Sequence, residues 1–222
     1  MEILPIVIVL MVMACFIAYA IWAAAERHKE MAAWATEKGL QFSPAKDRDL
    51  EDRHSHFKCL RRGHSRYANN IMRGELAGLN ITAFDYRYVT GHGKNRRQHN
   101  ISALIARSDL PLKPLSIRRE HMFDKVTEFF GADDIDFESA EFSNKFYVKA
   151  QDKKWAYAVI HQGMMDYLLQ APKFSIQFDV NEIIVWRSRR FRPEDFETAA
   201  QLIRDMLDRL PDYLVQDLKS DF

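Results

Sequence analysis

An uninterrupted apolar stretch at the N-terminus constrains this chain more than any other feature. Ile3 to Ala25 comprises 23 residues and contains no charged side chain. Because an α-helix rises 1.5 Å per residue and a bilayer core of about 30 Å needs about 20 apolar residues, this stretch is long enough to span a membrane with some tilt. Tyr19 and Trp22 lie near its C-terminal end, where aromatic rings favour the membrane interface. The sequence therefore predicts one transmembrane helix.

The charged residues that flank the stretch predict its orientation. Only the α-amino group and Glu2 precede it, whereas Arg27, His28 and Lys29 follow it. Lys and Arg are retained on the cytoplasmic side of a membrane, and acidic residues count for little. We therefore expect a single-pass protein of the cell inner (cytoplasmic) membrane, with its N-terminus outside and its soluble part facing the cytoplasm.

Two other interpretations of the stretch stay open. Ala23, Ala24 and Ala25 have the small side chains of a signal-peptide cleavage site. Against cleavage, Met1 and Glu2 provide no basic side chain before the apolar run, which is also longer than that of a typical signal peptide. The third interpretation is a buried core helix. The anchor accounts best for the length and the flanks together.

The composition of the chain is that of a globular protein. Hydrophobic residues make up 47% and charged residues 28% of the chain. The net charge is +1, so no overall charge drives the molecule to nucleic acid, and no nucleic-acid partner is expected. Cys15 lies in the apolar stretch and leaves Cys59 alone in the soluble part, which excludes an intrachain disulfide there. This fits a reducing compartment, and a periplasmic domain without disulfides stays open as an alternative.

The residues after the stretch predict an α+β fold. Antiparallel β-hairpins and packed helices are both expected, and no strict alternation of strands and helices appears. The last helix, over Pro193–Leu210, is amphipathic. We expect three parts: a transmembrane anchor over 1–25, a juxtamembrane helix over 26–41 that ends near Gly39, and a soluble α+β domain over 42–222.

Alternating apolar and polar residues predict a long hairpin over Asn69–Thr90. In its second arm Phe84, Tyr86 and Tyr88 form an aromatic stripe on one face, with Asp85 on the other. The other expected elements are a central strand over Gln98–Arg107, an extended linker over Leu110–Pro114, a short strand over Leu115–Arg118, helices over His121–Phe130 and Lys154–Gln170, a strand over Phe142–Lys149, and a second hairpin formed by Phe174–Phe178 and Ile183–Trp186.

The run Phe84–Arg97 reads F-D-Y-R-Y-V-T-G-H-G-K-N-R-R and resembles a family of uncharacterised bacterial membrane-anchored proteins. Members of that family have an N-terminal hydrophobic anchor and a segment of the type F-D-Y-R-Y-x-T-G-x-G-K-x-R. Asp134–Glu138, Phe142-Ser143 and Tyr147 are similar to a later motif of the same family. The likeness covers most of the chain from about Thr36 onward. It implies the anchored architecture and brings no reaction, substrate or cofactor.

Charge is unevenly distributed along the chain. Arg53 to Arg73 contains six Lys or Arg residues and no acid, and Tyr86 to Ser108 is also basic, whereas Asp124 to Glu141 is acidic. One interpretation is a basic surface close to an anionic membrane leaflet, where each cation gains about 1 kcal/mol. The other is solvated surface charge, partly paired with the acidic segment.

The loop Gly91–Arg97 contains the candidate anion- or headgroup-binding residues Lys94, Arg96 and Arg97. Glycines and basic side chains together can bind an anion through backbone N–H groups and guanidinium forks. The phosphate-binding pattern G-x-x-x-x-G-K-[ST] is not met, because Asn95 follows Lys94. A plain hairpin connection is the competing interpretation of this loop.

Metal and catalytic patterns are weak. His54, His56, Cys59 and His64 have the residue types of a zinc site, but their spacing matches no common structural zinc pattern. The acidic run Asp133–Glu141 lacks the glycine of an EF-hand loop. We therefore expect no metal and no cofactor, and we identify no catalytic residue.

These observations favour a non-enzymatic interaction or sensing module, anchored by one membrane span, with the basic loop near the anionic leaflet. Its expected partner is an anionic lipid or a protein. The alternative is a membrane-anchored hydrolase or phosphate-handling enzyme, which requires a pocket where Arg96, Arg97 and histidines meet a carboxylate. A structural subunit of a membrane complex is the third class, and it requires an exposed apolar patch on the domain.

Overall fold

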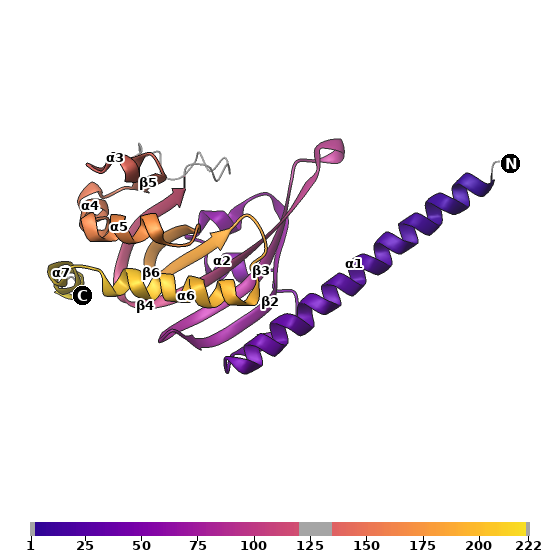
Figure 1. Ribbon diagram of the computed structural model, residues 1–222, viewed down its shortest axis with the longest axis horizontal. Helices are drawn as coiled ribbons and strands as arrows, with labels where there is room; N and C mark the ends of the chain where they lie inside the picture. The colour runs from indigo at the N-terminus through magenta and orange to yellow at the C-terminus, as the bar shows by residue number, and fades with distance from the viewer. Residues whose placement is uncertain (1–2, 120–134, 221–222) are drawn as a thin grey trace.

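A computed structural model describes residues 3–119 and 135–220 (Figure 1). Its longest element is helix α1 (Ile3–Glu37), which leaves the body of the molecule and carries the N-terminus far from it (Figure 1). Helix α1 runs without a break past the end of the apolar stretch, and Gly39 follows it with a φ of +70°. The prediction of a helix that continues to about residue 38 and ends near Gly39 is confirmed. The division at residues 25 and 41 stays a prediction.

The described strands form one six-stranded antiparallel sheet. The strands are β1 (Gln41–Ser43), β2 (His64–Leu76), β3 (Leu79–Thr90), β4 (Arg97–Arg119), β5 (Phe146–Ala150) and β6 (Ser175–Arg187). Strands β1 to β5 follow one another in order across the sheet, and β6 also pairs with β4. Strand β4 is therefore the centre of the sheet: β3 and β5 each pair with part of it, and β6 pairs along most of its length.

The predicted α+β class and the long first hairpin are confirmed. Strands β2 and β3 pair through a turn at Ala77-Gly78, and β2 begins earlier than predicted, at His64. The helix predicted over Pro193–Leu210 is α6 (Pro193–Asp208), with a proline in its first turn and Asp195 accepting a hydrogen bond from the backbone N–H of Arg192.

Two strand predictions are wrong, and strand β4 explains both. The predicted linker Leu110–Pro114 lies inside β4, where its prolines fall between the paired positions of two register shifts. The predicted second hairpin around Asn181-Glu182 is the single strand β6, which pairs with β4 before and after a kink at Val180. A neighbouring strand long enough to pair with both halves keeps β6 extended where its local sequence resembles a turn.

Two other segments differ from the prediction, and a third lies outside the described residues. The predicted strand Phe142–Lys149 divides into helix α3 (Ala140–Ser143) and strand β5. The predicted helix Lys154–Gln170 is two helices, α4 (Lys153–Val159) and α5 (Gln162–Gln170), because the backbone of His161 is extended between them. The predicted helix His121–Phe130 lies outside the described residues.

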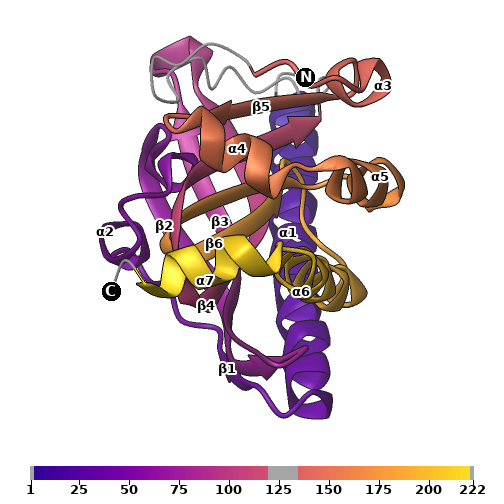
Figure 2. The ribbon, with the colours of Figure 1, turned by 90° about the vertical axis from the view of Figure 1, so that its left-hand side faces the viewer.

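Two apolar clusters cover the two faces of the sheet. One face packs against the second half of α1 and against α4, α5, α6 and α7 (Asp212–Ser220); α4 and α7 lie in front of the strands in Figure 2. The other face is covered by the segment that contains α2 (Leu50–Arg53) and the short helix η1 (Lys58–Arg61), through Leu50, Phe57 and Leu60. The aromatic stripe of β3 packs on this second face. The sheet is thus buried on both sides.

Candidate functional site

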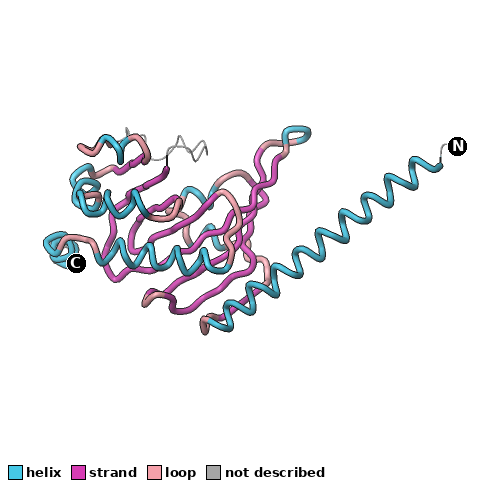
Figure 3. The backbone as a smooth tube through the Cα atoms, in the orientation of Figure 1, coloured by secondary structure: helices cyan, strands magenta, loops and turns pink. Residues whose placement is uncertain are grey.

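The basic loop predicted from the sequence forms the tip of the hairpin between β3 and β4. Thr90 pairs with Arg97 across the base of the tip, and the short helix η2 (Gly93–Asn95) closes it. Gly91 has a φ of +69°, and a Cβ at this position would lie 2.4 Å from the carbonyl oxygen of Asn95. Only glycine fits there. Figure 3 shows this hairpin projecting from the rest of the domain.

The three candidate side chains of the tip, Lys94, Arg96 and Arg97, are all exposed. None of them forms an ion pair within the described part of the chain. Other members of the basic stretches are paired: Arg53 and Arg66 contact Asp47 and Glu51, respectively. The prediction of solvated, partly paired charge therefore fits the stretch from Arg53 to Arg73, although the described partners of Arg53 and Arg66 lie outside the predicted acidic segment. The tip is different, because its cations are left for solvent or a ligand.

Two histidines extend the basic surface at the tip. The rings of His64 and His92 stack with centroids 4.9 Å apart and planes 2° from parallel. His64, at the start of β2, also lies 3.2 Å from the carbonyl oxygen of Gly91 through Nε2. His64 was a candidate zinc ligand, but the fold places it here and away from His54 and His56.

A buried polar cluster joins α1 to the middle of the sheet. Asp85 of β3 is 2% exposed, and its carboxylate accepts hydrogen bonds from Arg27 Nε at 3.2 Å and Nη2 at 3.1 Å. Asn70 of β2 and Ser102 of β4 donate to the same carboxylate at 2.9 Å and 2.5 Å. Arg27 Nη2 also donates to the carbonyl oxygen of Phe191 at 2.6 Å. The charge is paired and its hydrogen bonds are satisfied, as a buried charge requires.

Residues further along α1 continue this attachment. His28 contacts the amide of Asn70, and Met31 and Ala35 are fully buried against the sheet. Trp34 packs on Phe196 of α6 with ring centroids 5.9 Å apart. Helix α1 is therefore held by the domain from Arg27 onward, directly after its apolar stretch ends.

The local sequence pattern does not predict this cluster. It places Asp85 on the face of the hairpin opposite the aromatic stripe, because Phe84 and Tyr86 lie on either side of it. Arg27 was used only to orient the span. A signal existed: a carboxylate in the middle of a strand whose neighbours are apolar needs a cation, and α1 supplies one just after the apolar stretch.

The tip and the N-terminal half of α1 lie on the same side of the domain (Figure 1, Figure 2). Asp85, which holds Arg27, precedes Gly91 by six residues of extended strand, or about 20 Å. The tip therefore projects beyond the point where α1 meets the domain. The relative position of the tip and the apolar stretch is fixed by the Arg27–Asp85 pair and by the packing of Trp34.

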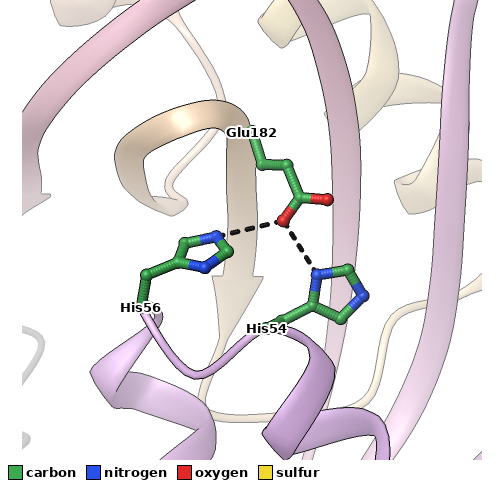
Figure 4. A group of neighbouring side chains, drawn as sticks. All are labelled: His54, His56 and Glu182. Carbon is green, nitrogen blue, oxygen red and sulfur yellow. Dashed lines mark hydrogen bonds and ion pairs between the residues drawn. The ribbon is translucent and has the colours of Figure 1, made fainter.

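The histidines of the candidate zinc group separate in the fold. His54 and His56 lie in the turn between α2 and η1, and both contact the carboxylate of Glu182 on β6 (Figure 4). Burial alone would raise the pKa of Glu182, but the adjacent His54 and His56 lower it to about 2. Cys59 is buried in the core, which raises the pKa of its thiol to about 12.

The strand that carries Glu182 contains an unusual backbone position. Val180 has a φ of +57°, which a β-branched residue rarely adopts and which costs about 1–3 kcal/mol. Its side chain is 58% exposed. The kink lies two residues before Glu182, which pairs with Arg107 of β4.

The acidic run is only partly described. Asp124, Glu128, Asp133 and Asp134 lie outside the described residues. Glu141 forms an ion pair with Lys145 at 2.6 Å, one turn along the chain. The contacts of this segment therefore do not bring its carboxylates together as cation ligands within the described residues.

Comparison with solved structures finds a similar fold. The chain is similar to the crystal structure of the mycobacterial trehalose monomycolate transport factor A, TtfA, with a TM-score of 0.61 and 12% sequence identity. The similarity covers 83% of this chain and 96% of the other. No family model matches the chain, and no curated protein matches it either. At this identity the likeness concerns the fold, which is α+β with one N-terminal helix that is long and apolar enough to cross a membrane.

Proposed function

We propose that this chain is a single-pass inner-membrane protein whose cytoplasmic domain is a non-enzymatic interaction module, with the tip residues Lys94, Arg96 and Arg97 at the anionic headgroups. The observation that carries the proposal is the rigid connection between α1 and the sheet. The apolar part of α1 exposes large apolar side chains along its length, so it needs a surrounding other than water. A buried core helix is excluded by this exposure.

The geometry of the hairpin supports contact between the tip and the bilayer. Arg27 lies two residues after the apolar stretch, at the level of the membrane interface. From there the hairpin extends about 20 Å toward the side on which α1 enters the bilayer (Figure 1). Because a headgroup layer is about 5–8 Å thick, an extension of about 20 Å reaches this depth without entering the hydrocarbon only if α1 is tilted, and tilts of roughly 0–40° are usual for membrane helices. Cations at this position gain about 1 kcal/mol each from an anionic leaflet.

The fold neighbour is consistent with such a role. TtfA is named a transport factor, a name that specifies no chemical reaction. We extend to this chain only the general idea of a membrane-anchored domain that binds other components, either anionic lipid or a protein partner. The resemblance to a family of membrane-anchored proteins, carried by the segment Phe84–Arg97, belongs to the same proposal.

The enzyme alternative is less well supported. It requires Arg96 and Arg97 to meet histidines and a carboxylate in a pocket. The two arginines are exposed on the tip, whereas the carboxylate with two histidines is Glu182, which pairs with Arg107. Ten residues of β4 separate Arg97 from Arg107, or about 33 Å of extended strand. The groups that the alternative needs lie far apart.

Vesicle binding tests the contact at the tip. A chain that begins at Glu26 and carries Lys94→Glu, Arg96→Glu and Arg97→Glu should bind anionic vesicles at least about 100-fold more weakly than its parent, because about 3 kcal/mol of attraction is lost. The matched control reverses three exposed lysines elsewhere, Lys153, Lys154 and Lys219. Equal weakening in both variants, or none in the tip variant, would contradict the proposal.

Two measurements test the anchor and its orientation. The full chain should stay in the membrane after carbonate extraction with an intact mass, whereas a soluble product that begins at Glu26 would mean that the stretch is a cleaved signal peptide. A C-terminal fluorescent-protein fusion should fold and fluoresce in the cytoplasm. Activity of a C-terminal alkaline phosphatase fusion would instead place the domain on the outer side.

A further inference from the structure

We propose that His54, His56 and Glu182 form a binding site for a divalent transition-metal ion, of which Zn²⁺ fits the ligand set best. The three residues come from two parts of the chain, the turn after α2 and strand β6, yet all three side chains point toward one place (Figure 4). Their ligand atoms are His54 Nδ1, His56 Nε2 and a Glu182 carboxylate oxygen, and these atoms lie within 4.8 Å of one another.

The distances are close to those of ligands on a common ion. Glu182 Oε2 lies 2.8 Å from His54 Nδ1 and 3.0 Å from His56 Nε2. Zinc bonds of about 2.0–2.2 Å in a tetrahedral arrangement place ligand atoms roughly 3.4 Å apart. A bound ion therefore requires the carboxylate oxygen to move from the nitrogens by a few tenths of an ångström.

His56 gives a second indication. Its Nε2 is buried and lies 3.0 Å from the carboxylate, but it makes no hydrogen bond. Because this ring nitrogen is close to the oxygen but not aligned with it, its lone-pair direction points away from the oxygen and is free for another atom. That arrangement is expected of two ligands directed at a third atom, and a metal ion would also satisfy a buried polar atom that otherwise has no partner.

The ligand types select the class of ion. Two imidazoles and one carboxylate form the protein ligands of several zinc sites and of other transition-metal sites, whereas Ca²⁺ and Mg²⁺ prefer oxygen ligands alone. Cys59 is buried in the apolar core and does not join the group. Three protein ligands leave at least one position for water or for a group of a partner.

Neighbouring residues hold the ligands in place. Phe57 is fully buried and packs against His56 with ring centroids 4.1 Å apart, and Gln177 Nε2 donates to the carbonyl oxygen of His56 at 3.2 Å. The position of Glu182 is fixed by the pairing of strands β6 and β4, in which it lies opposite Arg107. Asp179 lies on the same strand, close enough to His56 for the histidine to lower the pKa of its carboxyl group, which burial raises. Preorganised ligands of this kind favour metal binding.

The site would connect two segments that are distant in sequence. An ion on these ligands would tie the α2–η1 segment, which covers one face of the sheet, to the kinked part of β6. Because an ion that binds only the folded chain raises its stability, the site would make the stability of this face depend on metal concentration. About 33 Å of strand β4 separates Arg107, which pairs with Glu182, from Arg97 at the basic tip. The two features can therefore be tested separately.

The test uses the full chain in detergent micelles after treatment with a chelator. Competition with a chromophoric chelator should give one Zn²⁺ per chain, and the melting temperature should rise with Zn²⁺. The double variant His54→Gln/His56→Gln should bind Zn²⁺ at least tenfold more weakly, since even the loss of groups behind a ligand costs about 10–100-fold. Glu182→Gln should weaken binding in the same direction.

The matched control is the double variant His64→Gln/His92→Gln, which removes the other histidine pair of the domain. It should keep the full affinity; if it loses Zn²⁺ instead, the ion binds at the tip and the proposal is wrong. Co²⁺ gives a measurement on the unchanged chain, which does not depend on how the variants fold. Stoichiometric visible absorption from Co²⁺ bound to nitrogen and oxygen ligands supports the site, and its absence overturns the proposal.

Discussion

Helix α1 has one continuous backbone but two halves, residues 3–25 and 26–37, with opposite surroundings. In the first half, large apolar side chains such as Phe16, Ile17 and Trp22 are 58–70% exposed. In the second half, Met31 and Trp34 are buried against the sheet and α6. A helix that is apolar on all sides needs an apolar environment on all sides, whereas one with an apolar stripe needs a single partner. One continuous helix therefore has two parts that need different surroundings.

The domain is attached rigidly to the apolar half of α1. No linker separates the two halves, and the first polar residues after the apolar stretch are already attached to the domain. Arg27 binds Asp85, and Trp34 packs on Phe196. Any tilt of the apolar half in a bilayer would therefore be transmitted to the sheet and to the tip of the β3–β4 hairpin.

Deleting one half or both halves of α1 should give the largest difference. A chain that begins at Glu26 keeps the docked half, so it should move to the soluble fraction and still unfold cooperatively. A chain that begins at Leu40 also loses Arg27 and Trp34, leaving Asp85 unpaired in the core, so it should aggregate or lose its cooperative transition. Fractionation and thermal melts followed by circular dichroism check both. Identical melting temperatures would show that the second half is not part of the core.

Two tryptophans on the same helix give a matched substitution. Trp34→Ala should lower the free energy of unfolding by about 3–5 kcal/mol, because it removes a large buried side chain between α1 and α6. Trp22→Ala, 59% exposed, should leave the stability of the domain unchanged. Both variants can be compared by chemical denaturation in micelles. A similar loss in the two would mean that the halves are not distinguished by packing.

Two cations after the apolar stretch give the electrostatic version of the same test. Arg27→Met should destabilise the domain by about 3 kcal/mol, because it leaves the Asp85 carboxylate buried without its cation. Lys29→Met should have little effect, since Lys29 is 78% exposed and its contact with Glu26 is 3.9 Å long. Combining Arg27→Met with Asp85→Asn should recover part of the loss. If the double variant is as unstable as the sum of its parts, the pair is not coupled.

The smallest expected effect concerns the face of the sheet opposite α1. In a chain with Cys15→Ser, a thiol reagent at pH 8 should leave Cys59 unmodified, since the thiol is buried and its pKa is raised to about 12. The same should hold after Trp34→Ala, because Cys59 belongs to the other cluster. Labelling should appear only with denaturant. Rapid labelling of the Trp34→Ala variant in buffer would show that the two faces open together.

The elements that local sequence controls were predicted well. The apolar stretch, the hairpin over Asn69–Thr90 and the amphipathic α6 depend on neighbouring residues, so their patterns are visible in the chain. Strand β6 was predicted as a hairpin because Asn181-Glu182 looks like a turn. Its extended form depends on β4, whose full length was also missed.

The candidate site shows the same division. Lys94, Arg96 and Arg97 were predicted as an exposed basic loop, and they are exposed. Their assignment as headgroup ligands stays a prediction. The convergence of His54 and His56 on Glu182 was not predicted, because more than 120 residues separate the histidines from the carboxylate. No spacing rule for metal ligands spans such a distance along the chain.

The sequence by itself determined that the first two dozen residues prefer hydrocarbon to water, because that preference is a sum over side chains and depends on no fold. It also determined the α+β class, through local periodicity. Only the tertiary structure decided that Asp85 is a buried partner of Arg27 and that Glu182 meets two histidines. The physical reason is that burial and pairing of charges arise between segments far apart in sequence, which come together only when the sheet assembles.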